Sequence, residues 1–95
     1  MAVVVGLLSV ELYLPSCHSL KDKRMVLRSV KDRLKKFNVA VAEVEHLDMW
    51  QRGGLGVVAV SNERDHVDRT LRAALDEIER VEPGLVARSE QELLT

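Results

Sequence analysis

The segment "SLKDKRMVLRSVKDRLKKFNVAVAEVEH" (Ser19 to His46) decides the fold, because a helical pattern in it gives way to an extended one. Ser19 is a favourable residue for the cap of a helix. Five apolar residues then recur at intervals of three, four or seven, which places them on one helical face. They are Leu20, Leu27, Val30, Leu34 and Phe37. After Asn38, the stretch from Val39 to His46 predicts a strand.

Further strands are predicted on both sides of this segment. Residues 2–13 are rich in Val and Leu and end before Pro15, and Leu55 to Ser61 form another β-branched run. A short final strand is predicted from Leu85 to Gln91.

A second helix is predicted to begin after a cap at Asn62 and to stop at Pro83 and Gly84. Its apolar stripe comprises Val67, Leu71, Leu75, Ile78 and Val81. The resulting order is β-α-β-β-α-β. With right-handed crossovers, this order predicts an α+β fold, the ferredoxin-like sandwich, in which two helices cover one face of a four-stranded antiparallel sheet.

The other face of that sheet would be open, and alternation along the first two strands divides their side chains between the two faces. The set expected to meet the helices comprises Val10, Leu12, Ala40, Ala42 and Val44. The set expected on the open face comprises Val3, Val5, Leu7, Ser9, Glu11, Val39, Val41, Glu43 and Glu45. Because an apolar half beside an acidic half favours burial against another copy, we predict a homodimer through the open face.

The composition fits one small domain spanning residues 1–95, with 46% hydrophobic residues and modest stability unless a partner adds burial. No apolar run is long enough to cross a bilayer, and the opening "MAVVVGLLSVEL" lacks the features of a secretory leader. We therefore expect a cytoplasmic protein. Since Cys17 is the only cysteine, neither an internal disulfide nor a cysteine-based zinc cluster is expected within one chain.

The first predicted helix carries an excess of positive charge. The segment from Ser19 to Phe37 has eight Lys or Arg and two Asp, so its charge is +6, whereas the remainder carries −7. Five of these cations recur at intervals of three and four and form one continuous ridge. We call Lys21, Arg24, Arg28, Lys31 and Lys35 the basic ridge. In the second helix, three aspartates each precede an arginine by four residues, which predicts that this helix largely neutralises itself.

The basic ridge predicts a binding surface for a polyanion, most simply RNA phosphates. Five contacts would give a slope of roughly −3.5 to −4.5 in log K against log salt concentration. The alternative is a solvated face, or a ridge paired with acids of the second helix or of another subunit. RRM-type recognition is not expected, because the strand "LGVVAVS" displays no aromatic residue. A KH-type loop is not expected either, because "GGLG" precedes a strand.

The connection "HLDMWQRGGLG" (His46 to Gly56) holds the only tryptophan of the chain. Its candidate contact residues are Asp48, Trp50, Gln51 and Arg52. They form either a recognition surface, since loops display functional groups, or part of a simple turn. In the second case Trp50 folds back over the core, while Gly53 and Gly54 permit the chain to reverse.

Two arrangements invite a catalytic or metal-binding interpretation. Cys17 stands beside His18 where a helix begins, a position that lowers a thiol pKa, but no acid is evident to orient the histidine. His46 is close in sequence to Glu43 and Glu45, but alternation sends it to the face opposite both. We predict no catalytic residue, no metal site and no cofactor.

Several stretches together resemble the YlxP-like family, small bacterial proteins of unassigned function: "SLKDKR", "FNVAVAEV", "DMWQR" and "LGVVAVS". The resemblance extends over roughly Ser19 to Leu71, implies a ferredoxin-like fold and brings no catalytic residue. Family members are often encoded beside translation and ribosome-maturation factors, which implies an RNA or ribosomal partner. The matching positions with suitable chemistry are Lys21, Lys23, Arg24, Arg28, Asp48, Trp50, Gln51 and Arg52.

Together these observations predict a non-enzymatic homodimer that binds RNA or a ribosomal component weakly. The residues expected to make the contact are Lys21, Arg24, Arg28, Lys31, Lys35, Trp50 and Arg52. The alternative is a homo-oligomeric protein-interaction module with no nucleic-acid role, in which the basic ridge docks an acidic protein or a Glu-rich face of another copy.

Overall fold

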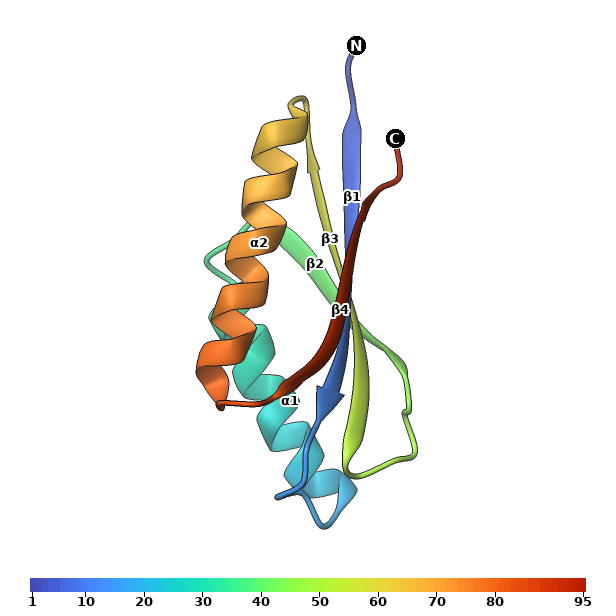
Figure 1. The fold of residues 1–95 in the computed structure, drawn as a ribbon, viewed down its shortest axis with the longest axis vertical. Helices are drawn as coiled ribbons and strands as arrows, with labels where there is room; N and C mark the ends of the chain where they lie inside the picture. Colours follow the sequence, from blue (N-terminus) through green and yellow to red (C-terminus); the bar gives the residue numbers. More distant parts are fainter.

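A computed structural model describes residues 1–95, and its elements follow the order β-α-β-β-α-β that the sequence predicts. The strands are β1 (Val4–Tyr13), β2 (Val39–Glu45), β3 (Arg52–Ser61) and β4 (Val86–Leu93), and the helices are α1 (Leu20–Leu34) and α2 (Arg64–Val81). The strands form one antiparallel sheet in the order β2-β3-β1-β4. Both helices lie on the same side of this sheet (Figure 1). The predicted ferredoxin-like architecture is confirmed.

The first helix begins where the sequence predicts. The Ser19 hydroxyl accepts a hydrogen bond from the Asp22 backbone N–H (3.0 Å), and the Asp22 carboxylate accepts one from the His18 N–H (3.0 Å). These bonds satisfy N–H groups at the helix start that have no partner within the helix itself. Regular α-helix ends at Leu34 rather than Phe37, whose N–H bonds to the Leu34 carbonyl (3.0 Å).

The predicted cap of α2 is wrong by one position. Glu63, not Asn62, is the cap residue, and its side chain makes no capping hydrogen bond. The helix ends at Val81, and Gly84 follows with a φ of 81°, a left-handed conformation that glycine adopts without strain. Neither helix is sufficiently long and apolar to span a membrane.

The core lies between the sheet and the helices. Side chains of β1 alternate between the core and the open face as predicted, and Val10 and Leu12 are buried against the helices. The second helix packs closely on this strand, because a Cβ atom at Gly6 would lie only 2.5 Å from Cγ1 of Val67. A larger residue at position 6 would therefore push α2 away from the sheet.

The predicted faces of β2 are wrong for most of the strand. Val39 and Val41 pair in register with the buried residues Ala59 and Val57, so they face the helices. The residues exposed on the open face are Ala40, Ala42 and Val44. The register with β3 decides which side chains of β2 enter the core, and it places the larger valines there.

A β-bulge between Glu43 and Glu45 changes the alternation at the end of β2. Glu43 lies opposite Leu55 and faces the helices, whereas Glu45 lies opposite Gly54 and shares the open face with it. A Cβ atom at Gly54 would be 2.7 Å from that of Glu45, so the close approach requires glycine. His46 follows with a φ of 59°, a conformation uncommon for residues other than glycine.

Candidate nucleic-acid interface

All five side chains of the basic ridge are exposed, and they lie on the flank of α1 turned away from α2. Four of these five residues come directly after a buried residue of the helix. One position corresponds to a rotation of about 100°, so these side chains point away from the core-facing side. The opposite flank carries Arg33, which contacts Glu77 of α2. At 1.5 Å per residue, Lys21 and Lys35 are about 21 Å apart along the helix axis. The basic ridge is thus a long strip at the edge of the helical layer.

The rest of the chain leaves the basic ridge largely unneutralised. Lys35 Nζ lies 3.2 Å from Asp32 Oδ1 on the same helix, and both side chains are mostly exposed. Such surface pairs contribute about 0–1 kcal/mol and are screened by salt. The four other cations, Lys21, Arg24, Arg28 and Lys31, have no carboxylate within ion-pair distance. Acids of α2 therefore do not pair with the ridge.

The flank of α1 that faces α2 is neutralised by one buried carboxylate. Glu77 is 4% exposed, and its oxygens lie 3.0 Å from Arg33 Nη1, 2.9 Å from Lys36 Nζ and 3.1 Å from Arg80 Nη1. Hydrogen bonds from Lys36 and Arg33 lower the pKa of Glu77 from its usual 4.5 to about 2. Arg80 follows Glu77 by three residues, a spacing visible in the sequence, but Arg33 precedes it by 44 positions, so the contact between the two helices is not predictable from local sequence.

The ion pairs predicted within α2 form only in part. Arg72 lies 3.1 Å from Asp68, four residues earlier, as expected. Arg80 pairs with Glu77 instead of Asp76. The second helix therefore relies less on pairs at the i,i+4 spacing than its sequence predicts.

Lys23 belongs to α1 but not to the basic ridge. It is only 2% exposed, and its Nζ donates to the backbone carbonyls of His46 (2.6 Å) and Met49 (2.8 Å). The same atom lies 2.7 Å from Glu43 Oε2, which has no other polar partner. These contacts occupy the ammonium group. Lys23 therefore has no capacity left for an external ligand and instead ties the connection between β2 and β3 to α1.

The connection between β2 and β3 is held at several points but displays apolar side chains. The Gln51 side-chain amide donates to the backbone carbonyls of Pro15 (3.3 Å) and Cys17 (3.1 Å), and the Gln51 backbone carbonyl accepts from the Leu14 N–H (2.9 Å). Trp50 is nevertheless 51% exposed, so it does not fold back over the core. Leu47 and Met49 of the same connection are also exposed, as is Tyr13 at the end of β1. Asp48 is exposed as well.

Arg52, a predicted contact residue, is engaged within the sheet. Its guanidinium donates to the Glu11 carboxylate, and His46 Nε2 lies 2.7 Å from the same carboxylate oxygen. Hydrogen bonds from His46 and Arg52 hold the pKa of Glu11 below its usual 4.5. Because Arg52 already has an anionic partner, it is a weaker candidate for phosphate binding than the basic ridge.

The environment of Cys17 opposes an activated thiolate. The residue is 1% exposed and packs in the core, and burial raises the pKa of its thiol. The nearby charges of Asp22 and Glu82 act in the same direction. Cys17 therefore serves as a small apolar residue.

The bulge in β2 alters the surroundings of His46. Glu45 Oε2 lies 3.7 Å from His46 Nε2, so the prediction that these two side chains lie on opposite faces of the sheet is wrong. Glu43 lies on the opposite face, as an ion-pair partner of Lys23. No group of three or more His, Cys, Asp or Glu side chains is arranged to hold a metal ion.

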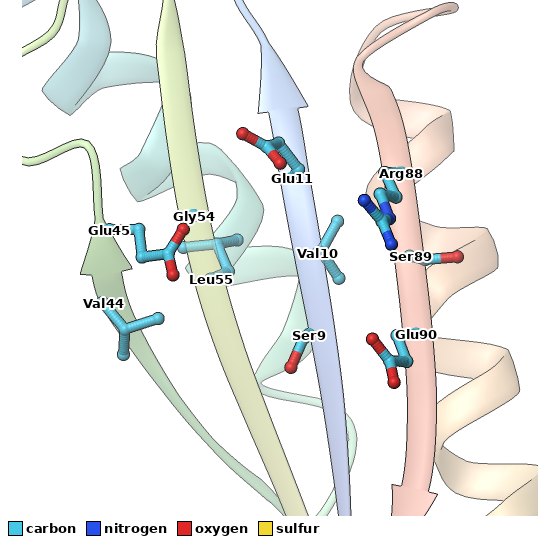
Figure 2. Close-up of a pocket in the computed structure, with 10 residues that line it drawn as sticks. All are labelled: Ser9, Val10, Glu11, Val44, Glu45, Gly54, Leu55, Arg88, Ser89 and Glu90. Carbon is cyan, nitrogen blue, oxygen red and sulfur yellow. The ribbon is translucent and has the colours of Figure 1, made fainter.

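Two depressions of the surface lie where a ligand is considered. One lies on the open sheet face, has a volume of about 180 Å³ and is lined by residues from all four strands (Figure 2). This volume is below the roughly 300–1,000 Å³ of typical small-molecule sites. The other, of about 440 Å³, is an open groove along α1 that includes Arg28 of the basic ridge. Its remaining lining residues are Met25, Ser29, Asp32 and Arg33.

Similarity to solved structures supports the fold. A de novo designed protein, Foldit4, matches 98% of this chain and 97% of its own with a TM-score of 0.61 at 14% identity. A dimeric ferredoxin-like protein of unknown function from Thermobifida fusca matches 100% of this chain and 92% of its own, with a TM-score of 0.61 at 11% identity. SnoaB, a cofactor-independent oxygenase from Streptomyces nogalater, gives a TM-score of 0.51 at 14% identity, over 100% of this chain and 93% of its own. At these identities the likeness concerns the fold alone.

Sequence similarity identifies the family. The chain is 36% identical over 73 residues to the uncharacterized protein YlxP of Bacillus subtilis (strain 168), which covers 76% of this chain and 79% of that protein. Residues 5–91 match the family model described as "Protein of unknown function (DUF503)". The resemblance to YlxP-like proteins is thereby confirmed, and the chain belongs to the DUF503 family.

Proposed function

We propose that this protein binds RNA, or an RNA-containing surface of the ribosome, through the basic ridge and without catalysing a reaction. The observation that carries the proposal is the lack of ion-pair partners for Lys21, Arg24, Arg28 and Lys31 on one exposed helix flank. Four phosphate contacts would give a slope of about −2.8 to −3.6 in log K against log salt concentration. The binding would therefore be weak at physiological salt. A ribosomal partner implies a cytoplasmic location.

The shape and charge of the surface favour contacts to the nucleic-acid backbone. The basic ridge is a strip about 21 Å long that runs along α1 to its cap residue Lys35, which suits a row of phosphates more than a single anionic group. The remainder of the chain is net negative, which favours this flank over the rest of the surface for a polyanion. The open sheet face displays no aromatic residue along β3, so this strand offers no side chain for stacking bases in the RRM manner. Recognition through phosphates and shape follows from these features.

Binding to a structured ribosomal RNA fragment, measured by fluorescence anisotropy over a series of salt concentrations, tests the proposal. We expect affinity to fall steeply with salt and the double variant Arg28→Glu with Lys31→Glu to abolish binding without unfolding. A matched control reverses the same amount of charge on α2, through Arg69→Glu with Arg72→Glu, and should retain binding. A flat salt response, or equal losses in both double variants, contradicts the proposal.

A second candidate function is protein association through the open sheet face. Apolar side chains of three adjacent strands meet there: Val3, Val5, Leu7, Ala40, Ala42, Val44, Val58 and Val60. Val3, Val44 and Val60 are 47%, 58% and 52% exposed, which favours burial against another copy. The Thermobifida fusca protein of similar fold is dimeric. We propose that two copies of this chain associate through this patch. In the alternative in which the protein does not bind RNA, this association is its whole function.

Light scattering tests the association. The double variant Val44→Asp with Val60→Asp should convert a dimer to a monomer, because it places charges in the apolar patch. Met25→Asp is the matched control, since Met25 is 63% exposed on α1, outside the patch. A monomeric parent protein contradicts the dimer. If charge reversal on the basic ridge changes the assembly and RNA does not bind, the ridge serves protein association instead.

A further inference from the structure

Two of the three aromatic side chains lie exposed at one end of the sheet. Trp50 is 51% exposed and Tyr13 is 53% exposed, whereas Phe37 packs against the core. Tyr13 pairs in register with Arg52, which is two residues beyond Trp50, so both aromatics occupy the same end of β1 and β3. Met49, 43% exposed, adds a further apolar side chain there. We call Tyr13, Met49 and Trp50 the aromatic tip.

The backbone beneath the aromatic tip is fixed by contacts from other elements. Lys23 binds the carbonyls of His46 and Met49, on the two sides of the turn. The Met49 N–H donates to the His46 carbonyl (3.0 Å). The side chain of Gln51, the residue after Trp50, donates to carbonyls of the β1–α1 connection. An aromatic side chain with two rotatable bonds on a fixed backbone loses little entropy when a ligand covers it. The exposure of Trp50 is therefore a feature suited to binding rather than a frayed loop.

The aromatic tip adjoins the start of the basic ridge. Lys23, whose side chain reaches Met49, lies in sequence between Lys21 and Arg24, the first two cations of the ridge. The connection between β2 and β3 and the first turns of α1 occupy the same end of the molecule (Figure 1). A strand of nucleic acid that follows the ridge towards the beginning of α1 therefore arrives at the connection that carries Trp50.

We propose that Trp50 stacks an unpaired RNA base at the end of the phosphate-binding ridge. The inference rests on the proposed RNA binding and specifies its ligand. A cationic strip alone suits any polyanion, and an exposed aromatic alone suits any apolar partner, whereas a nucleotide presents a phosphate and a flat base together. The favoured ligand is an RNA stem that carries a bulged or looped-out nucleotide, since a paired base is not free to stack on a side chain.

Two RNA hairpins with equal numbers of phosphates test this proposal, one fully paired and one with a single bulged adenine. We expect the bulged hairpin to bind more tightly and to quench the fluorescence of Trp50, which is the only tryptophan and so reports on its own surroundings. Trp50→Ala should lower affinity for the bulged hairpin by about 5- to 140-fold. The salt slope should stay unchanged, because the phosphate contacts remain.

Two further variants complete the experiment. Trp50→Phe should keep most of the preference for the bulged hairpin, because it retains an aromatic face. Leu47→Ala, a change at a 57% exposed residue of the same connection, should alter neither affinity nor fluorescence. Steep salt dependence with equal affinity for both hairpins and no quenching overturns the stacking proposal and leaves the basic ridge as an RNA site. Failure to bind either hairpin overturns both proposals. An effect of Trp50→Ala on molecular mass but not on RNA affinity assigns the aromatic tip to a protein contact and overturns stacking.

Discussion

The two flanks of α1 carry similar charges in different surroundings. On the flank facing α2, Arg33 and Lys36 share the carboxylate of Glu77 with Arg80. On the other flank, four of the five cations of the basic ridge have no anionic partner. The formal charge of the helix is therefore a poor guide to its function. Cations that the fold itself neutralises contribute to stability, and those it leaves unpaired are available to a partner.

The largest expected effect comes from breaking an internal contact of α1. Lys23→Met should lower the free energy of unfolding by about 3 kcal/mol, because it leaves a largely buried carboxylate and two carbonyls without their donor. Lys31→Met, on the basic ridge, should stay within about 0.5 kcal/mol. Urea denaturation of the two variants measures the difference. Equal stabilities would show that the burial of Lys23 does not distinguish it from the ridge.

Reversing charge on either flank of α1 gives the next largest effect. Arg33→Glu with Lys36→Glu places two carboxylates against Glu77 and should lower the melting temperature clearly. Arg28→Glu with Lys31→Glu changes the net charge equally but should alter stability by no more than about 0.5 kcal/mol per site. Thermal unfolding followed by circular dichroism compares them. Similar melting temperatures for both double variants would refute the division of α1 into two flanks.

The smallest expected effect is a change in the acid sensitivity of folding. Glu77 has a pKa of about 2 in the folded protein against a usual 4.5. Because the folded-state pKa is lowered, its contribution to stability is present above pH 4.5 and is lost as the pH falls towards 2. Glu77→Gln should therefore reduce the fall in melting temperature between these pH values. Parallel curves for the parent protein and the variant would show that Glu77 does not couple protonation to folding.

Local features of the fold were predictable from the sequence. The cap at Ser19 and the three- and four-residue spacing of α1 indicated both the helix and its ridge of cations. The turn residues at Pro83 and Gly84 indicated the end of α2. Such signals arise from residues within a few positions of one another, where helix and turn geometry leaves few alternatives.

Contacts between distant segments were not predictable in the same way. The alternation of β2 was assigned to the wrong faces, because "VAVAEV" is apolar on both sides until its register with β3 is known. The bulge that brings Glu45 towards His46 depends on Gly54 of the neighbouring strand. Trp50 is exposed on a connection that hydrogen bonds from Lys23 to Met49 and from Gln51 to Cys17 tie to α1 and to the β1–α1 segment, which lie far away in the sequence.

For this protein the sequence alone determined the order of the elements, the position of α1 and the spacing of its cations, because backbone periodicity is a local property. Only the tertiary structure decided which of those cations are neutralised, which face of β2 is buried and where the single tryptophan lies. Ion pairing and strand register depend on which distant residues meet in space, and a local pattern carries no information about them.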